Sequence, residues 1–403
     1  MGNEGKQPIG RIVVAFLVGV ALAVGICLFV PQVRAAIAGG QQTPAQSAAS
    51  GSNDTQAQAS FDNAHIDYSK TFPSWNKDSA ALAELVSFVS NATDPASKGY
   101  VEPADRVATF DMDGTLVCEK APVYFDFCLT MHRVLDDASF SATPEERSAM
   151  EATREQANQG KVYDPSDGPT KSDLVASAFA GMTPKDFRAY VNDFADKTAA
   201  VGFANMTYAQ SFYKPMTEVV DYLRANQFDV WVVSACEREV TRAMVSRIGV
   251  PMDHVVATDV AYASTKQNGQ VADKYNMGLD EDVVLSTPLD EVECGKNGKP
   301  LAIMREIGKR PILAFGNSSG DYAMLNFTES NPEHKGMGVL VLCDDTVREY
   351  GDAERAKEQT EESARQGWTL FHMSDQDWAT IYGEGVTKTQ LPGAQEGAQQ
   401  QAA

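Results

Sequence analysis

The stretch FDMDGTLVCE, residues 110–119, places two carboxylates, Asp111 and Asp113, directly after a short apolar run. A carboxylate can attack an electrophile and form a covalent intermediate, and phosphorus is a suitable target when a metal ion neutralises its oxygens. The second acid can protonate the leaving oxygen and later deprotonate water. The pair therefore predicts phosphoryl transfer, although a solvated turn after a strand would place two acids in the same way.

The next two residues could extend this site. Gly114 lets the backbone turn sharply, and amides in such a turn can face phosphate oxygens. Thr115 either belongs to that phosphate-binding turn or only caps it. We therefore expect Gly114 and Thr115 on the substrate side of the acid pair.

Three later segments supply the partners that phosphoryl transfer requires. Ser234, followed by Ala235, offers a hydroxyl donor to phosphate, although the serine could instead be the N-cap of the following helix. Lys299 offers a positive charge near the attacking carboxylate, with Lys296 as the alternative lysine. Asn317 and Asp321, in GNSSGDYAML, offer oxygen ligands for Mg²⁺.

Short apolar runs lead into most of these residues and predict buried strands. These runs cover residues 106–110, 229–235, 254–260, 311–317 and 338–343. Amphipathic helical patterns separate them, at 78–91, 216–227, 237–248 and after residue 319. Strands alternating with helices predict an α/β fold, a doubly wound parallel sheet whose carboxyl edge holds the site.

Residues 120–212 interrupt this alternation with mostly helical patterns. Thr143-Pro144 and Thr183-Pro184 each combine an N-cap threonine, a proline at the first helical position and a nearby acid, which is typical of helix starts. We interpret 120–212 as a helical cap domain inserted between the first strand and the rest of the sheet.

Taken together, the four segments resemble those of the haloacid dehalogenase-like hydrolase superfamily, in its phosphoserine-phosphatase-like branch. The resemblance covers roughly residues 75–385 and implies a Rossmann-like core with a helical cap. It implies that Asp111 is the nucleophile, Asp113 the general acid/base, Ser234 and Ala235 the second motif, and Lys299 the third. Four motifs in this order, on the expected elements, are far more specific than the DxDGT motif alone.

The fourth motif departs from the family pattern, because Asn317 stands where an aspartate is usual. The resemblance implies a Mg²⁺ site built from Asp111, the backbone carbonyl of Asp113, Asn317 and Asp321. An amide oxygen can ligate Mg²⁺ but brings no charge, so we expect a lower metal affinity than with a third carboxylate.

The N-terminus carries an apolar segment, residues 12–30, long enough to span most of a ~30 Å hydrocarbon core. Lys6 and Arg11 precede it, which favours a single-pass anchor with the rest of the chain outside the cytoplasm; secretion after signal cleavage is the alternative. The predicted organisation is a cytoplasmic N-terminus (1–11), a transmembrane helix (12–30), a flexible linker (31–60), the first part of the core (61–119), the cap (120–212), the second part of the core (213–385) and a disordered tail (386–403).

Composition excludes some other function classes. The net charge is −21 and no basic patch stands out, which argues against a nucleic-acid partner. The six cysteines show no CxxC spacing and so give no support for a zinc site. The sequence does not indicate an oligomeric state.

The best-supported function is a Mg²⁺-dependent phosphatase acting on a small phosphorylated metabolite outside the cytoplasm. Two alternatives stay open. One is a phosphotransferase or phosphomutase of the same superfamily. The other is a surface binding protein on a weakened hydrolase scaffold, for which Asn317 is the only support.

Overall fold

The computed structural model describes residues 66–162, 171–289 and 293–393. The predicted membrane segment (12–30) and linker (31–60) lie outside these ranges, as does most of the predicted tail. Across the described ranges, no helix combines the length and apolar character needed to cross a membrane.

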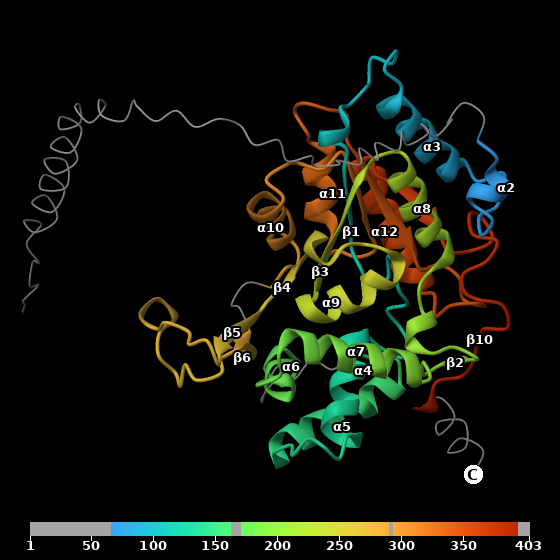
Figure 1. Ribbon diagram of the computed structural model, residues 1–403. Coiled ribbons are helices and arrows are strands. Elements are labelled where there is room, and N and C mark those ends of the chain that lie inside the picture. The colour runs from blue at the N-terminus through green and yellow to red at the C-terminus, as the bar shows by residue number, and fades with distance from the viewer. Residues whose placement is uncertain (1–65, 163–170, 290–292, 394–403) are drawn as a thin grey trace, which may run out of the picture. The chain divides into compact units, whose positions relative to one another are not determined.

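A six-stranded sheet forms the centre of the fold, in the order β4-β3-β1-β7-β8-β9 (Figure 1). Every neighbouring pair in it is parallel. The strands are β1 (Val107–Phe110), β3 (Asp229–Glu237), β4 (Val255–Thr258), β7 (Leu313–Gly316), β8 (Met337–Leu342) and β9 (Thr369–His372). The prediction of an α/β fold with a parallel sheet is confirmed, and all five predicted strands occur; β9 was not predicted.

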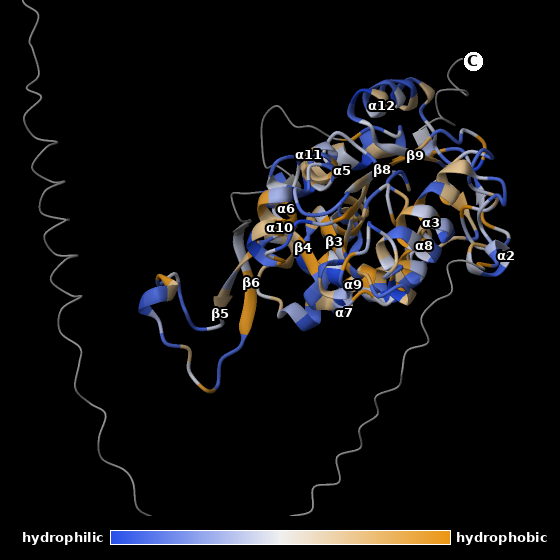
Figure 2. Ribbon diagram, turned by 90° about the horizontal axis from the view of Figure 1, so that it is seen from above, coloured by the Kyte–Doolittle hydropathy of each residue, from blue (hydrophilic) through white to orange (hydrophobic). Residues whose placement is uncertain are grey.

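Both faces of the sheet are buried, as expected for strands without polar alternation. In β8, Val339 and Val341 belong to one core cluster, whereas Leu340 and Leu342 belong to the other. Helices α3 and α8 contribute to the first cluster, and α10 and α11 to the second. In Figure 2 the hydrophobic colour gathers on central strands such as β3 and β4, while the outer helix α12 is mostly hydrophilic.

Eleven α-helices occur in the part of the chain that the structure describes. They are α2 (Tyr68–Thr71), α3 (Ala80–Thr93), α4 (Phe125–Met131), α5 (Pro144–Asn158), α6 (Lys171–Phe179), α7 (Pro184–Lys197), α8 (Lys214–Ala225), α9 (Arg238–Val245), α10 (Gly298–Glu306), α11 (Tyr322–Glu329) and α12 (Ala353–Gln366). The two predicted helix starts are confirmed: Thr143 caps α5 with a full capping box to Glu146, and Thr183 caps α7.

An antiparallel hairpin that the sequence analysis did not predict follows β4. Its strands are β5 (Val260–Ser264) and β6 (Val283–Leu289), and Figure 1 shows it leaving the end of β4 toward α6. The backbone of Leu285 exchanges hydrogen bonds with Gly181 and Met182, just after α6. The hairpin therefore connects the second half of the core to the helical segment.

The predicted start of the disordered tail, at Val386, is wrong. Strand β10 (Thr387–Lys388) pairs antiparallel with β2 (Phe203–Ala204), and the Lys388 ammonium donates to the backbone oxygen of Glu349. These contacts order the chain beyond the predicted boundary, by pairing it with β2 and by tying Lys388 to Glu349.

Candidate active site

The carboxyl ends of three adjacent strands meet at the candidate site. Asp111 follows β1, Ser234 lies near the end of β3, and Asn317 follows β7. Because β1 lies between β3 and β7, these residues share one edge of the sheet, where open parallel sheets form their sites. They line a cavity of about 540 Å³ together with Asp113, Glu119, Tyr124, Ala235, Cys236, Glu293, Gly295, Lys296, Lys299, Ser318, Ser319, Gly320, Asp321 and Arg355.

Lys299 joins the acids of the site. Its Nζ lies 2.6 Å from Oδ1 of Asp111, 2.7 Å from Oδ1 of Asp321 and 2.7 Å from the backbone oxygen of Val233. An ammonium group has three donors, so all three are used within the protein. Lys299 therefore holds the two carboxylates in place, whereas the side chain of Lys296, the alternative lysine, is exposed at the cavity wall.

Burial shifts the pKa values of both Asp111 and Lys299. Burial, together with the charge of Asp321, raises the pKa of Asp111 to about 7, although Lys299 acts in the opposite direction. Burial acts to lower the pKa of Lys299, but the carboxylates of Asp111 and Asp321 outweigh it and raise that pKa. The lysine is thus held charged between two buried acids.

The turn after β1 places Asp113 at the cavity, but the amides of this turn donate hydrogen bonds to carbonyl oxygens of the same turn. Gly114 N donates to Val117 O at 2.7 Å, and Thr115 N donates to Met112 O at 3.3 Å. The expectation that the amides of Gly114 and Thr115 face a phosphate is therefore wrong for these two residues. Thr115 Oγ1 lies 3.4 Å from Oδ2 of Asp111, consistent with a turn-capping role.

Gly114 is required at this position because of its backbone conformation and because a side chain would not fit there. Its φ is +82°, a conformation that side chains disfavour. A Cβ there would lie 1.8 Å from Nδ2 of Asn317 and 2.6 Å from Oε2 of Glu119. The glycine thus lets Asn317 and Glu119 approach the turn that carries Asp113.

A bulge presents the end of β3 to the cavity. The register with β4 shifts between Ser234 and Glu237, so Ala235 and Cys236 have no partner residue in that ladder. Bulges of this kind redirect side chains near functional sites. Ser234 Oγ accepts a hydrogen bond from Cys236 N at 3.1 Å.

The interpretation of Ser234 as a helix N-cap is wrong. The N-cap of α9 is Glu237, whose Oε2 accepts a hydrogen bond from Val240 N at 2.7 Å. Ser234 stays at the cavity, where its hydroxyl is placed to meet a ligand.

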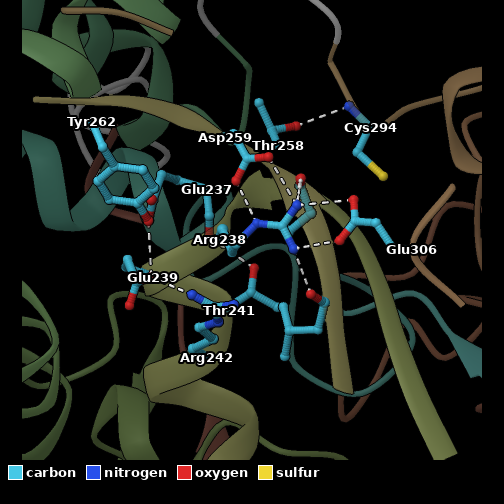
Figure 3. Close-up of polar contacts among 12 residues, drawn as sticks. Glu237, Arg238, Glu239, Thr241, Arg242, Thr258, Asp259, Tyr262, Cys294 and Glu306 are labelled. Carbon is cyan, nitrogen blue, oxygen red and sulfur yellow. Dashed lines mark hydrogen bonds and ion pairs between the residues drawn. The ribbon is translucent and has the colours of Figure 1, made fainter. Parts of the chain in front are cut away.

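An arginine network anchors the helix that carries Lys299 (Figure 3). Arg238 donates to both carboxylate oxygens of Glu306, at the end of α10, and to Asp259, which follows β4. It also donates to the backbone oxygen of Ala257, in β4, at 3.2 Å. Since Lys299 lies in the first turn of α10, these contacts fix the helix against β4 and so help to position the lysine.

The loop after β7 places the last two predicted residues. Oδ2 of Asp321 accepts hydrogen bonds from the amides of Asn317 (2.9 Å) and Ser318 (3.0 Å), and its Oδ1 contacts Lys299. Asp321 thus connects the loop after β7 to Lys299. The amide side chain of Asn317 faces Glu119, with 2.7 Å between Nδ2 and Oε2.

The donor set suits a hard divalent cation, although it contains few carboxylates. Among the described residues, no three His, Cys, Asp or Glu side chains cluster closely enough to hold a metal by themselves. Asp111, Asn317, Asp321 and the backbone carbonyl of Asp113 nevertheless offer oxygen ligands on one cavity, as Mg²⁺ prefers. Burial is the main cause of the raised pKa of Asp111, and repulsion from Asp321 adds to it; a bound cation would offset that repulsion.

The sequence analysis missed three residues of the site. Glu119 is only 5% exposed and contacts Asn317. Arg355 and Gln359 both reach the backbone oxygen of Asn317. Their spacing of four residues on α12 places them on one helix face, but nothing in the sequence says that this face covers the cavity.

The acids that follow β8, Asp344 and Asp345, lie outside the cavity. Asp344 contacts His372 and Ser374, and Asp345 accepts from the amides of Val347 and Arg348, so both hold loops after β8. The five cysteines in the described part of the chain are all buried.

Comparisons with known proteins support the family resemblance. The model of the haloacid dehalogenase-like hydrolase family matches residues 108–326, more than half of the chain. No curated protein matches with statistical significance. The likenesses to solved structures are weak, and they add no argument about function.

Three of these solved structures show how low the sequence identity and the TM-scores are. A protein of unknown function from Bordetella pertussis Tohama I is 16% identical, covering 66% of this chain and 98% of its own, with a TM-score of 0.43. Cytosolic 5′-nucleotidase IIIB bound to cytidine is 11% identical, covering 77% and 93%, with a TM-score of 0.43. A phosphoserine phosphohydrolase-like protein from Francisella tularensis is 12% identical, covering 63% and 92%, with a TM-score of 0.34.

Proposed function

On the premise that this chain belongs to the haloacid dehalogenase-like hydrolase family, we propose that it is a Mg²⁺-dependent phosphomonoester hydrolase. The observation that supports this proposal most is the contact between Lys299 and Asp111 at a cavity that Asp113 and Ser234 also line. Nucleophile, acid/base, hydroxyl donor and charge-balancing lysine then meet at one sheet edge, as phosphoryl transfer to an aspartate requires.

The proposed reaction has two displacements at phosphorus. Asp111 attacks, a bond forms between its carboxylate oxygen and phosphorus, and the bond from phosphorus to the ester oxygen breaks. Asp113 protonates that leaving oxygen. Asp113 then removes a proton from water, which attacks the aspartyl-phosphate, releases inorganic phosphate and restores Asp111.

The surrounding residues have separate tasks in this scheme. Lys299 favours the ionised form of Asp111, the form that can attack, and fixes its orientation. Ser234 offers its hydroxyl to a phosphoryl oxygen. Asp111, the carbonyl of Asp113, Asn317 and Asp321 would hold Mg²⁺, which neutralises charge on the phosphoryl group when bound.

We propose a small phosphorylated metabolite as the substrate. A cavity of about 540 Å³ is in the range that small ligands occupy. Glu119, directly before the segment 120–212, and Tyr124, near its start, both line the cavity. We infer that this segment acts as a cap that selects the substrate. A screen of phosphorylated metabolites, with released phosphate as the readout, would identify the class.

The test of the function uses the full chain in detergent and a chromogenic phosphate ester. We expect hydrolysis with Mg²⁺, its loss in EDTA, and a drop of about 10⁴-fold or more in kcat for Asp111→Asn. Normal turnover by Asp111→Asn would refute the aspartyl-phosphate. Product analysis with sugar acceptors separates hydrolysis from transfer, the alternative reaction of the superfamily.

A binding protein on a weakened scaffold is the second candidate, and Asn317 is the observation that favours it. Beryllofluoride mimics the phosphoryl group on an aspartate, so its Mg²⁺-dependent binding distinguishes the two functions. Binding supports the hydrolase, whereas no binding together with no turnover supports the binding protein.

We further propose that residues 12–30 anchor the catalytic part of the chain outside the cytoplasm. The apolar segment and the preceding Lys6 and Arg11 support this orientation. Protease accessibility in intact cells and in lysed cells tests it, because an external domain is digested in both. An N-terminus sequenced after residue 30 would instead indicate secretion by signal cleavage.

A further inference from the structure

Asn317 can serve a cation only if the correct end of its amide faces the cavity. The side chain carries one oxygen, which can ligate, and one NH₂ group, which a cation repels. An aspartate has no such ambiguity, because both its oxygens ligate. A site built with asparagine therefore needs a residue that fixes the orientation of the amide.

Glu119 meets that requirement. Its Oε2 lies 2.7 Å from Nδ2 of Asn317, and a carboxylate only accepts hydrogen bonds, so the NH₂ group must face it. Within the described residues, no donor reaches Oδ1 of Asn317, which is the end left for a ligand. The hydrogen bond thus selects the orientation in which the amide oxygen is available.

Glu119 is itself held rigidly. It is buried, and its Oε1 lies 2.5 Å from a guanidinium nitrogen of Arg355. Arg355 also donates to the backbone oxygen of Asn317 at 3.1 Å, and Gln359 donates to the same oxygen at 2.6 Å. Asn317 is therefore fixed through its main chain and its side chain by one connected network.

The charge of the cavity also depends on Glu119. Five carboxylates line it, those of Asp111, Asp113, Glu119, Glu293 and Asp321, against three cationic side chains, those of Lys296, Lys299 and Arg355. The formal excess is two negative charges, which matches one divalent cation. Without Glu119 the excess would be one.

We propose that Glu119 is a positioning residue of the cation site: it orients the Asn317 amide with its oxygen toward the cavity and supplies the negative charge that Asn317 lacks. This inference rests on the proposed Mg²⁺ dependence. It assigns to one Asn–Glu pair, 198 positions apart in sequence, the work that a single aspartate would do.

The experiment moves the charge from one partner to the other. Mg²⁺ is titrated into the full chain by isothermal calorimetry, comparing the unaltered protein with Glu119→Gln and with the double variant Glu119→Gln/Asn317→Asp. We expect Glu119→Gln to weaken Mg²⁺ binding about 10- to 100-fold, the usual effect of losing a residue that supports a metal ligand. The double variant should recover to within about threefold, because the carboxylate returns at position 317.

The outcomes separate the inference from the function on which it rests. Unchanged Mg²⁺ affinity in Glu119→Gln overturns the inference, and so does an equal loss in the single and double variants, since a merely structural role predicts that loss. No Mg²⁺ binding by the unaltered protein overturns the proposed Mg²⁺ dependence first, and the inference with it. Glu329→Gln is the matched control, because Glu329 is a half-buried carboxylate that accepts from Gly338 N outside the cavity and should bind Mg²⁺ normally.

Discussion

The ammonium nitrogen of Lys299 lies 2.6 Å from Oδ1 of Asp111, although the two residues are 188 positions apart in the chain. The contact is buried, and Lys299 is 1% exposed. Because the same nitrogen also contacts Asp321, one lysine bridges two carboxylates that would otherwise repel each other. This arrangement makes the lysine important for stability as well as for chemistry.

Replacing Lys299 with methionine should therefore destabilise the protein and abolish turnover. Two buried carboxylates would lose their cation, which costs about 3–5 kcal/mol of unfolding free energy at neutral pH. The deficit should shrink at acidic pH, because a protonated carboxyl needs no partner. Urea unfolding in EDTA at pH 7.5 and at pH 5 measures the loss of unfolding free energy and its dependence on pH.

Lys296→Met is the matched control for this prediction. The side chain of Lys296 is exposed, so its loss should change the unfolding free energy by no more than about 0.5 kcal/mol. If Lys296→Met lost turnover while Lys299→Met kept it, Lys296 would be the functional lysine.

Asp113→Asn should affect poor leaving groups more than good ones. An alkyl phosphate needs a proton on its departing oxygen, whereas a nitrophenyl phosphate needs much less help. We expect kcat/KM to fall about 10²- to 10⁴-fold for the alkyl ester and clearly less for the nitrophenyl ester. Equal losses for the two esters would show that Asp113 is not the general acid.

Arg238→Met should loosen the helix that carries Lys299. The substitution leaves Glu306 and Asp259 without their guanidinium partner, and since both acids are partly exposed we expect a loss of about 2–4 kcal/mol in unfolding free energy. Turnover should fall as well, because α10 positions Lys299.

A neighbouring arginine provides the comparison. Arg305 lies on the same helix but its side chain is 63% exposed, so Arg305→Met should cost no more than about 0.5 kcal/mol. Similar stability of the two variants would contradict the anchoring role of Arg238.

Glu237 should make the stability of the protein depend on pH. Burial, together with the nearby charges of Glu239 and Asp259, raises its pKa from 4.5 to about 8. Between these values the folded state binds a proton that the unfolded state has lost, so stability falls as the pH rises from about 4.5 to about 8. Glutamine keeps an acceptor for Val240 N and cannot ionise, so Glu237→Gln should remove this fall.

The measurement is the unfolding free energy of both proteins across pH 4.5–8.5. The advantage of Glu237→Gln should grow with pH and level off above about pH 8. Glu361→Gln, an exposed position on α12, should show a difference that does not change with pH. A constant difference for Glu237→Gln as well would mean that the carboxyl ionises normally in the folded state.

The sequence by itself determined five of the six strands of the parallel sheet, the order of the chemical residues and the helix starts at Thr143 and Thr183. These follow from local physics: apolar runs without polar alternation form buried strands, and a threonine before a proline caps a helix. The parallel sheet then follows, and with it the prediction that residues after β1 and β7 meet at one edge.

Only the tertiary structure decided which side chains touch. The burial of Glu119 depends on Arg355 and Asn317, both roughly 200 or more positions away, so its place in the cavity could not be predicted from the sequence. Likewise, the bulge after Ser234 and the anchoring of α10 by Arg238 arise from contacts between elements distant in sequence. Such pairings leave no periodic pattern within one segment. Local spacing therefore identifies the two acids of the turn after β1, while packing across the sheet edge determines what surrounds them.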